Sequence, residues 1–323
     1  MRLTWLSWLV GIALFAAVVF AALHVSEAGS FAALVEQARP GWLALALVLQ
    51  AATYLAQAQV WRSVLQARGM HLPMVVAYRL SLVKLLVDQA LPSSGLSGAV
   101  VVAGALQRRG AREETATAGI VVSSVGYMLA YATALLAGLG LLAEHRAVQG
   151  AVLVAGVGML ALVSGLALLA MRTAWRHPSQ AQGKHHLPGW LAHLLDRVAR
   201  ADLALARSPR LLALSGGLQL CIIALDCLTV WALIRSLGAD APIVSVFASF
   251  MVASLLRTVS IVPGGLGAFE AASVLALHGT GVPVPVALSA TLLFRGLSFW
   301  LPMLPGAWLA RDLLRQAPRP GAK

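Results

Sequence analysis

The chain has 323 residues, of which 59% are hydrophobic and only 11% are charged. Soluble domains carry roughly a quarter charged residues, so this composition excludes a soluble globular protein and predicts an integral membrane protein. The formal net charge of +12 could suggest nucleic acid. The basic residues lie between apolar segments, however, where they act as topology signals and attract anionic lipid, so we expect no nucleic-acid partner.

Six segments approach or exceed the roughly 20 apolar residues that cross a bilayer core. The first is longer than the hydrophobic region of a signal peptide, so we interpret it as a retained span, with a cleaved signal peptide as the alternative. The predicted spans are about 3–23, 41–61, 115–142, 149–171, 211–235 and 284–310.

Most of the 24 Lys and Arg residues fall on one side of the membrane when these spans alternate. They lie at the N-terminus, in 62–72, in 107–113, in 172–210 and after residue 310. By the positive-inside rule this side is cytoplasmic. We therefore expect a multi-pass protein of the cytoplasmic membrane with both termini inside the cell.

The basic segment 172–210 is the one long polar connection in the chain. In its second part, apolar residues from Trp190 to Leu205 recur at helical spacing, which predicts an amphipathic helix on the cytoplasmic leaflet. A solvated linker helix is the alternative. The histidines of this segment have no Cys or carboxylate at ligand spacing, so we expect no metal and no cofactor.

Two apolar regions, 73–106 and 243–280, are interrupted by proline and glycine and do not resemble simple spans. Their breaks, at Pro92 and Pro263, are 171 residues apart, and the same offset relates the start of the second span to that of the sixth. Short arms with helix breakers are typical of re-entrant hairpins. The alternative is that Pro-Gly turns resemble one another by composition alone.

The matching offset predicts a duplicated chain with pseudo-repeats at 1–142 and 149–310, within a single membrane domain. Each half would contain an odd number of crossings, so the second half would be inverted relative to the first. The expected fold is an all-α polytopic membrane protein, with about six full transmembrane helices and two re-entrant helical hairpins arranged as an inverted repeat.

Seven charged residues lie inside these apolar regions, and an ionisable group at bilayer depth is by default functional. We expect Glu270 to pair with Arg295 or Arg257, and Asp226 to join the same polar core. The alternatives are a purely structural ion network, a local Lys84–Asp88 pair at i,i+4, and a snorkelling Arg79. The seven residues are Arg79, Lys84, Asp88, Asp226, Arg257, Glu270 and Arg295.

The helix expected after Pro263, Gly264 and Gly265 would direct unsatisfied N–H groups and a positive dipole end toward the break. Such an end suits phosphate or carboxylate. Arg257 and Arg295 would add positive charge. The sequence therefore favours an anionic substrate at this break.

The motifs "PGGLGAFEA" and "LLFRGLSFWLPMLPG" in the second half, with "LPSSGLSG" and "RRG" in the first, carry a family resemblance. The chain resembles the transmembrane, flippase-like domain of lysylphosphatidylglycerol synthases, which is related to the membrane domain of the multiple peptide resistance factor. The positions that match the family are Pro263, Gly264, Gly265, Gly267, Glu270, Arg295 and Gly306, with Pro92, Gly95 and Gly98 in the first half.

The resemblance implies a domain that moves aminoacylated phosphatidylglycerol between leaflets. The synthases carry a soluble acyltransferase-like domain after the membrane part, whereas this chain ends soon after its last span, so we expect no enzyme activity. The stretch "SGAVVVAG" lacks the charges that first-half relatives often have there, which weakens the case for substrate contact from the first hairpin.

The leading hypothesis is a lipid flippase or transporter for an anionic or aminoacylated phospholipid. The main alternative is a non-catalytic subunit that scaffolds a lipid- or glycan-modifying enzyme through 172–210. A membrane-embedded lipid transferase is less favoured, since the chain shows no catalytic carboxylate or metal motif. Expected partners are a membrane phospholipid, with a homodimer and a separately encoded lipid-synthesising enzyme left open.

Overall fold

The computed structural model describes residues 36–90, 96–144, 165, 201–260 and 262–315. Within these residues the chain forms helices and no strand. The elements are α3 (Pro40–Gln66), α4 (Met74–Ala90), α5 (Leu96–Gln107), α6 (Glu113–Glu144), α9 (Leu203–Ala206), α10 (Pro209–Ser236), α11 (Ile243–Val259), the 3₁₀ turn η2 (Pro263–Gly265), α12 (Ala268–Gly279), α13 (Val284–Arg295), the π-helical η3 (Gly296–Trp300) and α14 (Leu301–Arg315).

Four helices in the described part are long and apolar enough to cross a bilayer: Pro40–Gln66, Glu113–Gly138, Pro209–Ser236 and Val284–Arg311. They match four of the predicted spans closely. Proline in the first turn starts three of the four, where its fixed φ suits a helix and its missing N–H costs no hydrogen bond. The other two predicted spans, 3–23 and 149–171, lie outside the described residues except for residue 165.

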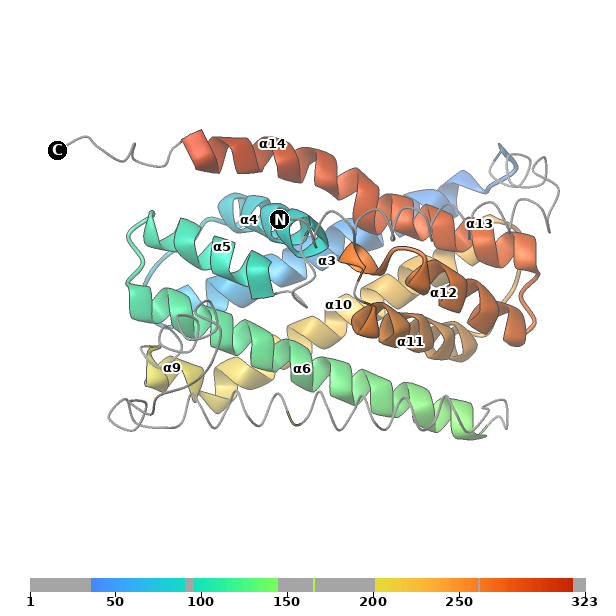
Figure 1. Cartoon of the computed structure of the whole chain (residues 1–323), viewed down its shortest axis with the longest axis horizontal. Helices are drawn as coiled ribbons and strands as arrows, with labels where there is room; N and C mark the ends of the chain where they lie inside the picture. Colours follow the sequence, from blue (N-terminus) through green and yellow to red (C-terminus); the bar gives the residue numbers. More distant parts are fainter. Residues whose placement is uncertain (1–35, 91–95, 145–164, 166–200, 261, 316–323) are drawn as a thin grey trace.

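The long helices and the short ones divide the molecule into a frame and two hairpins (Figure 1). Helices α3 and α10 pack against each other through the centre, α10 also packs on α6, and α14 packs on α4. The α4–α5 hairpin lies at one end of the frame and the α11–α12 hairpin at the other, with the C-terminal end of α4, the N-terminal end of α5 and the turn η2 toward the middle. The break predicted near residue 263 is present as the turn η2 between two short helices. The break predicted at Pro92 falls in residues 91–95, which lie outside the described part of the chain.

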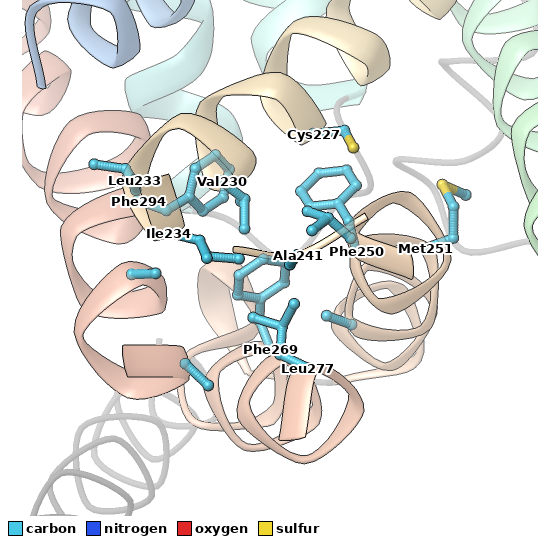
Figure 2. Close-up of a cluster of buried hydrophobic side chains, with 14 of the residues drawn as sticks. Cys227, Val230, Leu233, Ile234, Ala241, Phe250, Met251, Phe269, Leu277 and Phe294 are labelled. Atoms are coloured by element: carbon cyan, nitrogen blue, oxygen red, sulfur yellow. The ribbon is translucent and has the colours of Figure 1, made fainter. Parts of the chain in front are cut away.

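The largest apolar cluster surrounds the α11–α12 hairpin. Figure 2 shows Phe250, Phe269 and Phe294 gathered against residues of α10 such as Val230 and Leu233. The three rings lie 5.7 to 6.1 Å apart between centroids, within the range in which aromatic pairs stabilise a core. This cluster packs α11, α12 and α13 together and fixes the second hairpin against α10.

The described end of the basic linker differs from the predicted amphipathic helix. The helix does not continue through residues 201–210: Asp202 caps the four-residue α9 and Ser208 caps α10. Leu205 was expected on a lipid-facing surface, but it is buried against α6 residues such as Val121. Residues 172–200, including Trp190, lie outside the described part of the chain. Two capping residues placed close together favour two separate helices here over one continuous helix.

Candidate functional site

The turn of the second hairpin meets the C-terminal part of α4 in the middle of the frame. The turn η2, which begins at Pro263, contacts α4. Gly264, Gly265 and Gly267 all have positive φ, between 63° and 81°. A Cβ on Gly264 would overlap the Phe299 ring, and one on Gly265 would overlap the Arg257 side chain. Backbone conformation and close packing therefore favour glycine at these predicted site positions, independently of any substrate.

Glu270 and Arg295 form a buried ion pair directly behind this turn. Arg295 Nε donates to Glu270 Oε1 at 2.6 Å, and Arg295 Nη2 donates to the Gly264 carbonyl at 2.9 Å. The two side chains are 0% and 2% exposed, and the guanidinium also lies over the Phe269 and Phe299 rings. The predicted pairing of Glu270 with Arg295 is confirmed, and its alternative, a pair with Arg257, is not formed.

The other carboxylate oxygen of Glu270 lies at the N-terminus of α12. Glu270 Oε2 accepts a hydrogen bond from the Gly267 N–H at 2.6 Å. The carboxylate thus occupies a position where the sequence suggested a substrate anion, and it satisfies an N–H group that the helix itself cannot. Glu270 and Arg295 are accordingly placed to hold the turn against α13.

The first hairpin has a smaller arrangement of the same kind. Asp88 accepts one hydrogen bond from the Gly98 N–H and one from Lys84 Nζ, each at 2.7 Å. A Cβ on Gly98 would lie 2.5 Å from Asp88 Oδ1 and from the Lys84 carbonyl. The i,i+4 pair is therefore present, and Asp88 also caps α5, which sequence reasoning missed. Pro92 and Gly95 lie outside the described residues.

A cavity of about 120 Å³ lies between α3, α4 and the second hairpin. Most of its lining residues are polar or charged, and they come from six helices and η3. Its polar and charged lining residues include Gln50, Thr53, Tyr54 and Gln57 of α3, Lys84 and Asp88 of α4, Asp226 of α10, Arg257 of α11, and Arg295 of α13. The structure thus brings Asp226, Arg257 and Arg295 together, as the sequence predicted.

Two charged groups in this cavity lack a direct ionic partner. Asp226 accepts one long hydrogen bond, from Gln50 Nε2 at 3.3 Å. Arg257 lines the cavity and acts on Asp226 electrostatically. In the part of the chain that the structure describes, it forms neither an ion pair nor a hydrogen bond. A cation and an anion at this depth, each without a close partner, are available to bind the groups of a ligand.

Sequence reasoning missed the contribution of α3. Gln50 Oε1 and Gln57 Nε2 are buried without hydrogen-bond partners, and both residues line the cavity. Buried polar atoms of this kind usually bind water or a ligand. The signal was present as a polar stripe at helical spacing within the predicted span, through Gln50, Thr53, Tyr54 and Gln57.

The charged side chains that line the cavity are suited to binding a charged group of a ligand. Among the described residues no group of three or more His, Cys, Asp and Glu side chains is positioned to hold a metal ion. Ligand pockets usually enclose about 300 to 1,000 Å³, so a cavity of about 120 Å³ can take one small charged group and some water. Larger parts of a ligand would have to stay outside it.

The spanning helices, the broken hairpins and the charged cavity define a polytopic helical membrane protein with a buried polar centre. The chain belongs to the family described as the lysylphosphatidylglycerol synthase TM region, whose model matches residues 8–306, so the resemblance noted in the sequence is confirmed. It is also similar to the UPF0104 membrane protein PH1989 of Pyrococcus horikoshii, with 32% identity over 84 residues. That match spans 26% of this chain and 25% of the relative.

Proposed function

We propose that the protein moves an anionic or aminoacylated phospholipid between the leaflets of the cytoplasmic membrane, with the headgroup passing through the central cavity. The observation that carries this proposal is Arg257, a cation that has no ion-pair partner among the described residues and that lines a polar cavity beside α4 and the α11–α12 hairpin. A guanidinium matches the geometry of a phosphate and binds it through charge-assisted hydrogen bonds.

The cavity is suited to a headgroup and unsuited to a whole lipid. A phosphate and its nearest substituents are small enough for a space of about 120 Å³, and the acyl chains would remain in the bilayer. Carrying a charged headgroup through hydrocarbon without such a route costs on the order of tens of kcal/mol. A polar cavity among the helices would offer charged and hydrogen-bonding groups to the headgroup and would therefore reduce that cost.

Asp226 bears on which headgroup is preferred. A carboxylate near Arg257 would repel the negative charge of a phosphate, but it would attract an ammonium group. A headgroup with both a phosphate and a free amine, such as an aminoacyl ester of phosphatidylglycerol, could therefore use Arg257 and Asp226 together. The family to which the chain belongs carries the name of a synthase of such a lipid.

The helix bounds support the inverted repeat that we propose for this domain. Adding 171 to the bounds of the first four helices gives values within two residues of the second set. Thus 40–66 becomes 211–237 against Pro209–Ser236, 74–90 becomes 245–261 against Ile243–Val259, 96–107 becomes 267–278 against Ala268–Gly279, and 113–144 becomes 284–315 against the α13–α14 unit.

The directions of the helices support the same proposal. In Figure 1 α3 and α10 run in opposite directions, as do α6 and the α13–α14 unit, and the two hairpins enter from opposite ends. Helices α5 and α12 have 12 residues each, about 18 Å at 1.5 Å per residue, which is shorter than a bilayer core of about 30 Å. We therefore propose two re-entrant hairpins and six full spans, with both termini cytoplasmic.

The test is a leaflet-exchange assay in proteoliposomes with fluorescent phosphatidylglycerol, lysyl-phosphatidylglycerol and phosphatidylcholine. We expect Arg257→Gln to slow transport about tenfold or more for the lipids that the wild type moves, and Asp226→Asn to slow selectively the lipid with a free amine. Arg39→Gln is the matched control, since Arg39 is exposed at the start of α3, and it should transport at the wild-type rate.

Two results would contradict the proposal. Wild-type rates in Arg257→Gln, at equal amounts of folded protein, would remove Arg257 from the substrate route. Failure of the wild type to move any of the three lipids would reject the transporter. The role of a membrane subunit for a separate enzyme would then be favoured.

A further inference from the structure

A second hollow lies on the flank of the first hairpin, between α3, α4 and α14. It encloses about 400 Å³, which is within the range of ligand pockets and more than three times the size of the central cavity. Its lining is apolar except for Arg79 and the hydroxyl of Tyr78. The lining residues are Leu55, Met74, Val75, Tyr78, Arg79, Leu82, Pro305, Trp308 and Leu309.

The hollow opens to the surroundings of the protein. Val75 and Trp308 are each 63% exposed and Leu55 is 45% exposed, so its outer walls face the bilayer. One wall is formed where α14 crosses α4 closely: a Cβ on Gly306 would lie 2.9 Å from the Leu82 carbonyl. Pro305 and Trp308, on either side of this crossing, then line the space beside α4. An apolar groove open to lipid is filled by hydrocarbon chains.

Arg79 supplies charge complementarity to one class of lipid. It lies five residues after the start of α4, about 7.5 Å along the helix at 1.5 Å per residue. Its side chain is exposed and, within the described residues, has no ion pair or hydrogen bond. A guanidinium beside an apolar groove, near the end of a membrane helix, matches a phosphate with an acyl chain attached.

One aromatic contact connects the lining of the groove with the lining of the central cavity. Tyr78 lines the groove and Tyr54 lines the cavity, and their rings meet edge to face with centroids 6.1 Å apart. Helix α4 thus presents the groove on one face and Lys84 and Asp88 to the cavity on the other. A lipid in the groove would therefore lie beside the same helix that lines the polar centre, with the Tyr54–Tyr78 contact linking the two sites.

We propose that the groove is a lateral binding site for an anionic phospholipid, with one acyl chain between α4 and α14, the phosphate on Arg79, and the Tyr54–Tyr78 contact linking the site to the central cavity. As a point of entry the site rests on the proposed transport function. As a binding site it stands independently, because occupancy does not require transport.

Occupancy is tested with bimane attached at Val75→Cys in a Cys221→Ala background, where the remaining Cys227 is buried. Quenching is measured in nanodiscs with brominated-chain phosphatidylglycerol or brominated-chain phosphatidylcholine. One arginine near anionic lipid contributes about 1 kcal/mol, so we expect about a fivefold preference for phosphatidylglycerol. The preference should vanish with Arg79→Gln and return with Arg79→Lys.

Val48→Cys is the matched control, because Val48 is 64% exposed on α3 and does not line the groove. It should show no preference between the two lipids. Equal quenching by both lipids at position 75, an equal preference at position 48, or a preference that survives Arg79→Gln would overturn the site.

The role of the groove as an entrance is tested by filling it. Val75→Trp should slow the leaflet exchange of the transported lipid severalfold, and Val48→Trp should not, although both replace exposed valines. Equal rates in the two variants would refute the entrance while leaving the binding site in place. If the wild type moves no lipid, the transport function fails, and the quenching preference alone decides the binding site.

Discussion

Each of the two hairpins pairs a carboxylate with a basic side chain, but the helices that supply the two partners differ. In each, a carboxylate accepts a hydrogen bond from the N–H of a glycine at or near the start of the second helix of the hairpin, and a basic side chain neutralises that carboxylate. In the first hairpin both charged residues, Lys84 and Asp88, belong to α4. In the second, Glu270 belongs to α12 and its partner Arg295 to α13.

This difference separates a self-contained hairpin from an anchored one. The Lys84–Asp88 pair is partly exposed, with side chains 14% and 15% accessible, and it would survive a movement of α4 and α5 as a unit. The Glu270–Arg295 pair is almost inaccessible and connects the turn to a long helix of the frame. The charged contact at the first hairpin is therefore internal to that hairpin, whereas the one at the second hairpin ties the turn to the frame. The groove that we propose for lipid lies on the flank of the first hairpin.

The largest effect on stability is expected from removing the Glu270 charge, which tests whether this pair anchors the second hairpin. In Glu270→Gln the Arg295 guanidinium stays buried without a counterion, which typically costs 3–5 kcal/mol. We expect a large fall in the midpoint of thermal unfolding, measured by fluorescence-detected size exclusion in detergent.

The double variant Glu270→Gln with Arg295→Met removes both charges and should recover much of that loss. An unchanged midpoint in Glu270→Gln would show that the second hairpin is not anchored by this pair.

An intermediate effect is expected from Gly98→Ala at the first tip. The added methyl group would meet Asp88 and the Lys84 backbone at 2.5 Å, and such overpacking costs about 1–3 kcal/mol. Gly104→Ala on the same helix is the control, because nothing lies within 4 Å of its Cβ position. That variant should be neutral or slightly stabilising, since alanine is the better helix former. Equal midpoints for the two variants would disprove the close contact between α4 and α5.

The smallest effect is expected from Lys84→Gln, which removes the local ion pair of the first hairpin. Partly exposed i,i+4 pairs contribute a few tenths of a kcal/mol, and Asp88 keeps its hydrogen bond to the Gly98 N–H. The unfolding midpoint should shift by a few degrees at most. A loss as large as that in Glu270→Gln would erase the distinction between the two tips.

Much of the frame could be predicted from hydropathy alone. The four described spans begin and end within a few residues of the predicted ones, apart from longer C-terminal ends, because a bilayer-crossing helix is encoded by a long local run of apolar residues. The hairpins were also foreseen, since proline and paired glycines mark a break in any apolar helix. A pairing of Glu270 with an arginine, either Arg295 or Arg257, followed from the cost of leaving either charge alone in a membrane, and the structure shows that the partner is Arg295.

The site could be predicted only in part, because its polar groups come from helices that are far apart in sequence. Gln50 and Gln57 of α3 face the cavity only because α3 packs against α10. The capping role of Asp88 depends on where α5 turns back toward α4. Leu205 fits the pattern of a lipid-facing helix, yet the capping of α9 buries it against α6.

The sequence by itself determined that this is a helical membrane protein with two interrupted hairpins and charges at bilayer depth, because hydropathy and helix breakers act locally. Only the tertiary structure decided which charges neutralise one another and which remain available. Glu270 binds Arg295 and the N-terminus of its own helix, whereas Arg257, beside the cavity, has no direct partner within the described part of the chain. That choice depends on distances of a few ångströms between separate helices, which residue spacing along the chain does not specify.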